Sequence, residues 1–254
     1  MKKEITIKGL TIGNGFPKIC VPIVSKKTKD ILAAAWEAEK SDADLVEWRA
    51  DFWEELADRQ VLKNILEDLQ QIMKTKPLLF TIRTKAEGGE FLGTGKEYGE
   101  LVKAAAQRAD MADVEVFMKD LDTEELIQEI QKENCVVVGS NHDFYKTPEK
   151  EEIIRRLCFM QQIGADIPKI AVMPEKPKDV LTLLSATEEM YSSHADRPIV
   201  TMSMAGTGVI SRISGEIFGS AITFGSISKA SAPGQLELKE LRKALEIIHG
   251  GEIV

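Results

Sequence analysis

Short apolar runs alternate with longer amphipathic stretches along this chain, and this alternation limits the possible folds more than any other feature. The apolar runs have the length of buried strands and occupy residues Ile19–Val24, Asp44–Arg49, Leu78–Arg83, Asp113–Phe117, Cys135–Asn141, Pro168–Met173, Pro198–Met204 and Ala221–Gly225. The amphipathic stretches have helical periodicity and occupy residues Thr28–Lys40, Phe52–Lys74, Glu97–Arg108, Thr123–Lys132, Thr147–Ile163, Lys176–Tyr191 and Gln235–His249, with a short glycine-rich one at Thr207–Phe218. Apolar strands that alternate with helices indicate a parallel sheet covered by helices.

Eight such strands in 254 residues favour a single (β/α)₈ barrel over an open sheet. An open sheet that binds dinucleotides carries a GxGxxG loop after its first strand, whereas Val24, Ser25 and Lys26 follow that strand here. The alternating run Glu4–Leu10 and the turn signal Asn14-Gly15 predict an N-terminal β-hairpin that closes the bottom of the barrel. No linker or repeat interrupts the pattern, so we expect one domain over residues 1–254.

Charge and cysteine content exclude several classes of protein. The chain has 33 Lys and Arg against 41 Asp and Glu, a net charge of −8, which disfavours general binding of nucleic acid. The three cysteines lack the spacing of a zinc site or a disulfide framework, and we expect neither a metal nor a cofactor. Neither a secretory signal nor a run long enough to span a membrane is present, so we expect a cytoplasmic protein without a membrane partner.

Lys169 lies inside one of the apolar runs, where lysine is unusual because it is rarely buried without a partner. Burial lowers the pKa of a lysine, and a neutral amine is a nucleophile toward carbonyl carbons. The simpler alternative is a lysine at the end of a strand whose stem packs while its amine reaches water. Taken alone, this stretch favours the simpler alternative.

Other polar residues fall at the ends of the expected strands, where barrel enzymes place their active sites. They are Glu47, Arg49, Arg83, Glu87, Asp113, Glu115, His142 and Arg212. Each has a structural explanation: Glu47 and Arg49 could form an ion pair on one strand face, and His142 could be a structural residue. Together with Lys169 they form a set suited to Schiff-base chemistry on a ketone, with a general base nearby and an arginine for a carboxylate. Cationic neighbours would help to keep the amine neutral.

Six segments also resemble one enzyme family. They are DLVEWRADF (Asp44–Phe52), LLFTIRTKAEGGE (Leu78–Glu90), VVVGSNHDFYKTP (Val136–Pro148), IPKIAVM (Ile167–Met173), PIVTMSMAGTGVISRI (Pro198–Ile213) and FGSISKASAPGQL (Phe224–Leu236). Spread over nearly the whole chain, they resemble the type I 3-dehydroquinate dehydratases, the Schiff-base-forming enzymes of the shikimate pathway. The resemblance implies a dehydratase that acts on 3-dehydroquinate by syn elimination to give 3-dehydroshikimate, and it implies a homodimer.

The resemblance also assigns roles to residues. Lys169 would condense with the substrate ketone, His142 would act as general base and acid, Glu87 would pair with His142, and Arg212 would hold the substrate carboxylate. Further side chains would contact the ring hydroxyls or the carboxylate: Glu47, Arg49, Arg83, Ser231 and Gln235. Met202 and Met204 would pack against the ring. The loop that carries Ser231 and Gln235 would close over the substrate.

Two alternatives remain open from the sequence. A Schiff-base aldolase on the same barrel would need a phosphate site formed by the last two loops, but the loop Ser226–Gly234 is rich in serine and alanine. A non-catalytic barrel that only binds a ligand would give neither turnover nor an imine. The presence of Lys169, His142 and Arg212 together argues against this second alternative.

Overall fold

The computed structural model describes residues 3–227 and 234–250, and within them the chain forms a nine-stranded parallel sheet. Its strands lie in the order β11 (Leu236–Glu237), β10 (Ile222–Ser226), β3 (Lys18–Ile23), β4 (Leu45–Arg49), β5 (Leu78–Thr81), β6 (Met111–Glu115), β7 (Val136–Asp143), β8 (Ile167–Val172) and β9 (Val200–Ser203). A parallel bridge between Ile199 and Ser220 joins the β9 side to the β10 side, and the amide of Ala221 donates to the carbonyl of Ile199 at 2.8 Å. The expected (β/α)₈ barrel is therefore confirmed.

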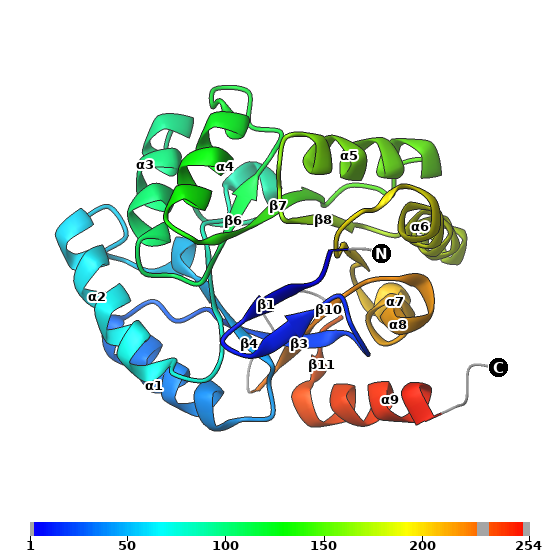
Figure 1. The fold of residues 1–254 in the computed structure, drawn as a ribbon, viewed down its shortest axis with the longest axis horizontal. Helices are drawn as coiled ribbons and strands as arrows, with labels where there is room; N and C mark the ends of the chain where they lie inside the picture. The colour runs from blue at the N-terminus through cyan, green and yellow to red at the C-terminus, as the bar shows by residue number, and fades with distance from the viewer. Residues whose placement is uncertain (1–2, 228–233, 251–254) are drawn as a thin grey trace.

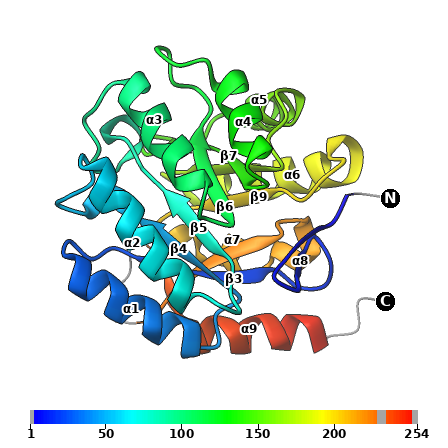
Figure 2. The same cartoon turned by 60° about the vertical axis from the view of Figure 1, so that its left-hand side comes forward.

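Helices surround this sheet in chain order, as the ring in Figure 1 and the turned view in Figure 2 show. They are α1 (Thr28–Lys40), α2 (Arg59–Ile72), α3 (Gly95–Ala106), α4 (Thr123–Lys132), α5 (Lys150–Gln162), α6 (Pro177–Glu189), α7 (Val209–Ile213), α8 (Gly215–Phe218) and α9 (Leu238–Gly250). Short helical turns also occur at Ala50–Phe52 (η1), Lys85–Glu87 (η2), Met190–His194 (η3) and Gly206–Gly208 (η4). The bounds of α1 and α4 coincide with those expected from the sequence.

The start of α2 differs from the prediction by seven residues because a local cap sets it. Asp58 precedes the helix, and its carboxylate accepts hydrogen bonds from the amides of Gln60 and Val61. Such a cap satisfies amide groups that have no partner within the helix, so the helix begins after it. The residues before Asp58 contain the separate short turn η1.

The N-terminal hairpin is present, but its turn lies earlier than the Asn14-Gly15 signal suggests. Strands β1 (Ile5–Ile7) and β2 (Leu10–Ile12) pair antiparallel around Lys8 and Gly9. Both turn residues have positive φ angles, 49° and 82°, as a tight two-residue hairpin turn requires. The amine of Lys8 donates to the carbonyl of Met73 and to Asp110, both at 2.7 Å, which fixes the hairpin against the barrel.

The inner face of the barrel is apolar at the hairpin end. Ile5 and Ile12 of the hairpin belong to the same buried cluster as one residue from each barrel strand. Those residues are Cys20, Leu45, Leu79, Met111, Val138, Ile167, Val200 and Ile222. The hairpin therefore closes the bottom of the barrel, as expected.

Two residues further along β4 to β8, the inner face becomes polar. Because side chains alternate between the faces of a strand, a residue two positions on points to the same side. Two positions after its apolar residue, each strand has a polar one: Glu47 on β4, Thr81 on β5, Asp113 on β6, Ser140 on β7 and Lys169 on β8. The change from apolar to polar thus happens at one level of the barrel and marks where a site can form.

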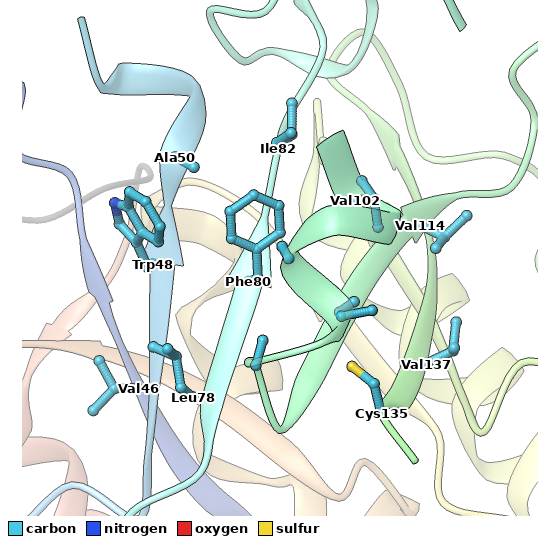
Figure 3. Packing of buried hydrophobic residues seen from close by; sticks show 14 of the residues in the cluster. Val46, Trp48, Ala50, Leu78, Phe80, Ile82, Val102, Val114, Cys135 and Val137 are labelled. Atoms are coloured by element: carbon cyan, nitrogen blue, oxygen red, sulfur yellow. The ribbon is translucent and has the colours of Figure 1, made fainter. Parts of the chain in front are cut away.

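The outer face of the sheet packs against the helices and forms the larger core. Figure 3 shows part of it, where residues of β4, β5 and β6 lie beside residues of α3. The ring of Trp48 makes edge contacts with Trp53 and Phe80, with centroids 5.5 Å apart in each pair. Full burial of such a side chain contributes roughly 1.5–3 kcal/mol, so this layer holds the strands that carry the polar inner face. None of the helices among the described residues is long and apolar enough to cross a membrane.

Candidate active site

A cavity of about 190 Å³ opens at the carboxyl ends of the strands. It brings together nearly all the side chains that the sequence suggested for a site. Its lining consists of Glu47, Arg49, Arg83, Glu87, Gly88, His142, Phe144, Lys169, Ala171, Met202, Met204, Arg212, Phe224 and Gln235. The remaining expected residue, Ser231, and most of the loop around it lie outside the described residues.

Lys169 points into this cavity from β8 and is only 4% exposed, which rules out an amine that reaches bulk water. Its Nζ atom lies 3.3 Å from Oδ2 of Asp113 and 3.9 Å from Oε1 of Glu47. It also lies 4.7 Å from the centre of the Phe224 ring. The ion-pair partners of the amine are therefore carboxylates, whereas the sequence suggested cationic neighbours.

The buried Glu87 pairs with the partly buried His142. Oε2 of Glu87 lies 2.9 Å from Nδ1 of His142 and also accepts the backbone amide of His142 at 2.9 Å. Burial, with a smaller contribution from Glu115, raises the pKa of Glu87 to about 8. Burial, reinforced by Arg83 and Lys169, lowers the pKa of His142 well below its ordinary value. Both directions favour a neutral imidazole, which is the form that can accept a proton.

Arg83 links the carboxylates of neighbouring strands rather than standing alone at the rim. Its Nη2 atom lies 2.8 Å from Asp113, and its Nη1 atom donates to Glu115 and to Ser140, both at 3.0 Å. Although burial opposes the charge, Asp113 and Glu115 raise the pKa of Arg83 well above its ordinary value. The guanidinium is therefore a fixed cation beneath the surface of the cavity.

The structural ion pair that the sequence allowed between Glu47 and Arg49 is replaced by other pairings. Arg49 makes a two-pronged contact with Asp51, through Nε at 2.8 Å and Nη2 at 2.9 Å. Glu47 accepts a hydrogen bond from Thr81 at 2.9 Å and lies near Lys169. Both side chains line the cavity, so both are placed to contact a ligand.

Arg212 enters the cavity from the short helix α7, which follows β9. The chain can turn back closely there because a Cβ atom at Gly208 would lie 2.2 Å from the carbonyl oxygen of Ser203. Ser211 ties the turn to the strand by accepting the amide of Ser203 at 2.9 Å. Arg212 is 1% exposed, and burial lowers its pKa to about 10, so it remains a cation at neutral pH.

Several residues of the site were not assigned from the sequence. Asp113 contacts both Lys169 and Arg83, and Ala171 and Phe224 line the cavity. The two-residue period of the strands was a usable signal, because Ala171 lies two positions after Lys169 on the same face. No group of three or more His, Cys, Asp or Glu side chains in residues 3–227 and 234–250 is arranged to hold a metal ion.

Fold and site together define a (β/α)₈-barrel protein with a lysine amine buried beside an imidazole–carboxylate pair. Residues 19–252 match the family model for type I 3-dehydroquinase. The chain belongs to the type I 3-dehydroquinase family.

Similarity to individual members extends over the full length. A 3-dehydroquinate dehydratase of Clostridioides difficile is 50% identical over 98% of both chains, and one of Listeria innocua is 49% identical over 97% of this chain and 98% of the other. The crystal structure of the type I enzyme of Clostridium difficile with covalently modified comenic acid has a TM-score of 0.95, covering 98% of this chain and 99% of that one. The enzyme of Geobacillus kaustophilus, 34% identical, also has a TM-score of 0.95, with 99% and 100% covered.

Proposed function

We propose that this chain is a hydro-lyase that converts 3-dehydroquinate into 3-dehydroshikimate and water through a Schiff base at Lys169. Membership of the family and the names of its relatives support the reaction. The structure of the relative with covalently modified comenic acid supports covalent chemistry in this fold. The observation that carries the proposal is the burial of the Lys169 amine in one cavity with His142.

In this reaction the amine of Lys169 adds to the substrate ketone, and loss of water gives an iminium ion. The iminium attracts electrons far better than the ketone, so it makes the adjacent carbon acidic without a metal. His142 removes that proton, and the resulting enamine expels the hydroxyl group, which leaves as water with the proton from His142. One imidazole serves both transfers, so both occur on one face of the ring and the elimination is syn. Hydrolysis of the iminium releases the product.

The other side chains of the cavity hold the substrate in this scheme. Arg212 pairs with the substrate carboxylate, because a guanidinium matches a carboxylate with two parallel hydrogen bonds. Polar groups for the ring hydroxyls or the carboxylate come from Glu47, Arg49, Arg83 and Gln235, and from Ser231, which lies outside the described residues. Met202 and Met204 pack against the ring, and Glu87 holds His142.

Product analysis tests this function. The purified protein is given 3-dehydroquinate, and formation of the conjugated enone of 3-dehydroshikimate is followed by its absorbance, with identification of the product by mass spectrometry. We expect enone formation by the wild-type chain and none by Lys169→Ala. Cleavage of a carbon–carbon bond would favour the aldolase alternative, and binding without turnover would favour the non-catalytic barrel.

We also propose that the chain works as one domain, as a cytoplasmic enzyme and as a homodimer. The uninterrupted barrel pattern supports one domain, and the family resemblance supports the dimer. Sedimentation equilibrium tests the assembly, and we expect a particle mass of about twice the chain mass of 28.2 kDa. Fractionation of cells that produce the chain tests the compartment.

A further inference from the structure

A chain of hydrogen bonds runs from the surface helix α5 to the pair of Glu87 and His142. Nη1 of Arg156 donates to Oδ1 of Asn141 at 2.9 Å, and Nδ2 of Asn141 donates to Oε1 of Glu87 at 2.9 Å. The other oxygen of Glu87 is the one that contacts Nδ1 of His142. Neither Arg156 nor Asn141 is among the residues that line the cavity. The side chains of both therefore reach the site through Glu87, and Arg156 also lies 3.9 Å from Oδ2 of Asp143.

Arg156 determines which way the Asn141 amide faces. A guanidinium has donors and no acceptor, so it accepts only the oxygen end of an amide as its partner. With Oδ1 held by Arg156, the NH₂ group must face Glu87. The opposite orientation would place donors against donors on one side and an oxygen against a carboxylate on the other.

We propose that Arg156 and Asn141 are positioning residues that fix Glu87 as an ionised acceptor for the Nδ1 proton of His142. This keeps Nε2 of the imidazole unprotonated as the base, and it rests on the proposed function. A donor hydrogen bond stabilises a carboxylate in its charged form, so the amide favours the ionised state of Glu87. If the amide turns, the carboxyl group holds its proton to higher pH.

The ionisation of Glu87 is sensitive to the loss of one hydrogen-bond donor. Arg83 lies 3.7 Å from it, and His142, Asn141, Glu115 and Asp113 are the other charged or polar groups that act on it. Burial and Glu115 raise the pKa of Glu87, while Arg83 and the Asn141 amide lower it, and the balance is about 8. Because this value is close to neutral pH, loss of one donor alters the share of ionised Glu87 in the working range.

The neighbouring residue Arg155 provides a matched control. Arg155 and Arg156 both pair with Glu152 on α5, but of the two the hydrogen bond to Asn141 comes from Arg156. Arg156→Met removes the donor that orients the amide, whereas Arg155→Met removes an equal charge one position away. Arg156→Lys keeps a head group that only donates and tests for rescue.

The experiment measures kcat/KM against pH for the wild type and these three variants. We expect the acid limb of Arg156→Met to move upward by about 1 to 2 pH units, in line with loss of a hydrogen bond to a charged group. Arg155→Met should keep the wild-type profile, and Arg156→Lys should return toward it. An unchanged profile for Arg156→Met, or an equal shift for Arg155→Met, would overturn the proposal.

A second readout separates this inference from the proposed function. The imidazole signals of His142 are titrated by NMR in the unliganded protein, where the chain has three histidines and His142→Asn identifies the signal. We expect the inflection that these signals report from the ionisation of Glu87 to move upward by the same amount in Arg156→Met. A shift in a protein that shows no turnover would support the positioning role and contradict the proposed reaction. Overlapping titration curves for wild type and Arg156→Met would contradict the positioning role even if the enzyme is active.

Discussion

The Oδ2 atom of Asp113 lies 3.3 Å from the Nζ atom of Lys169, and neither side chain is exposed by more than 4%. The other oxygen of Asp113 lies 2.8 Å from Arg83 and accepts the hydroxyl of Ser140 at 2.6 Å. Although burial opposes its charge, Arg83 and Lys169 lower the pKa of Asp113. One buried carboxylate thus pairs with both Arg83 and Lys169.

Removal of this carboxylate should destabilise the fold. We expect Asp113→Asn to lower the free energy of unfolding by about 3–5 kcal/mol, because it removes a buried charge that pairs with both Arg83 and Lys169. Urea denaturation at neutral pH measures the change, with the exposed Asp68→Asn as control. A loss no larger than that of the control would show that the network around Arg83 does not depend on Asp113.

Glu87 should make stability fall as pH rises above neutrality. In the folded chain its pKa is about 8, whereas an unfolded glutamate titrates near 4.5, so from pH 7 to pH 8 only the folded state releases this proton. The folded state then binds more protons than the unfolded state. The free energy of unfolding therefore decreases as the pH rises, by about 1 kcal/mol over this interval. Denaturation at pH 7.0, 7.5 and 8.0 checks the slope, and Glu87→Gln should remove its contribution. A wild-type slope of zero or of the opposite sign would contradict the pKa direction.

Arg212 should contribute to ligand binding at the expense of stability. Because burial lowers its pKa to about 10, folding disfavours the charged form of Arg212. We expect Arg212→Met to keep or increase the free energy of unfolding while lowering kcat/KM by about 100-fold or more, since a buried substrate carboxylate loses its cation. Parallel denaturation and kinetic measurements test both parts. A strong loss of stability, or nearly normal kinetics, would argue against a role in holding an anion.

Ala171 should be limited in size by the cavity. It is 1% exposed, lines the cavity, and lies opposite His142 and Met202 in the strand register. We expect Ala171→Val to lower kcat/KM by about 10- to 100-fold, because added carbon atoms would overlap the substrate or displace its neighbours. Ala171→Gly removes volume instead and should retain most activity. If the two variants lose activity equally, the effect comes from the backbone and not from the cavity.

The sequence predicted the barrel because it depends on a regular pattern, whereas Met202, Met204 and Gln235 were expected at the site only from the family resemblance. Strand periodicity and the carboxyl-end rule were enough to place Lys169 and His142 in one cavity. The ion pairs were not predictable, since Asp113 is separated from Lys169 by 56 residues and no local pattern relates their side chains. Glu47 and Asp51 each lie two positions from Arg49 in the sequence, and only the structure shows that Arg49 pairs with Asp51.

Helix starts and the hairpin turn are harder to predict from the sequence, because contacts of individual side chains and backbone conformation decide them. Threonine is a residue type typical of a helix cap, but Thr28 is the first residue of α1, and its hydroxyl donates to Glu55 and accepts from Trp53. The hairpin turn uses Lys8 in the left-handed region, which a lysine seldom adopts, so the glycine after Asn14 gave the stronger but wrong signal.

The central claim is that Lys169 forms a covalent imine with the substrate, and reductive trapping tests it most directly. Sodium borohydride is added during turnover of 3-dehydroquinate, and the intact mass and the modified peptide are determined. We expect one added ligand on Lys169 in the wild type, and no adduct in Lys169→Ala. An active wild-type enzyme that gives no adduct, or an adduct on another lysine, would contradict it.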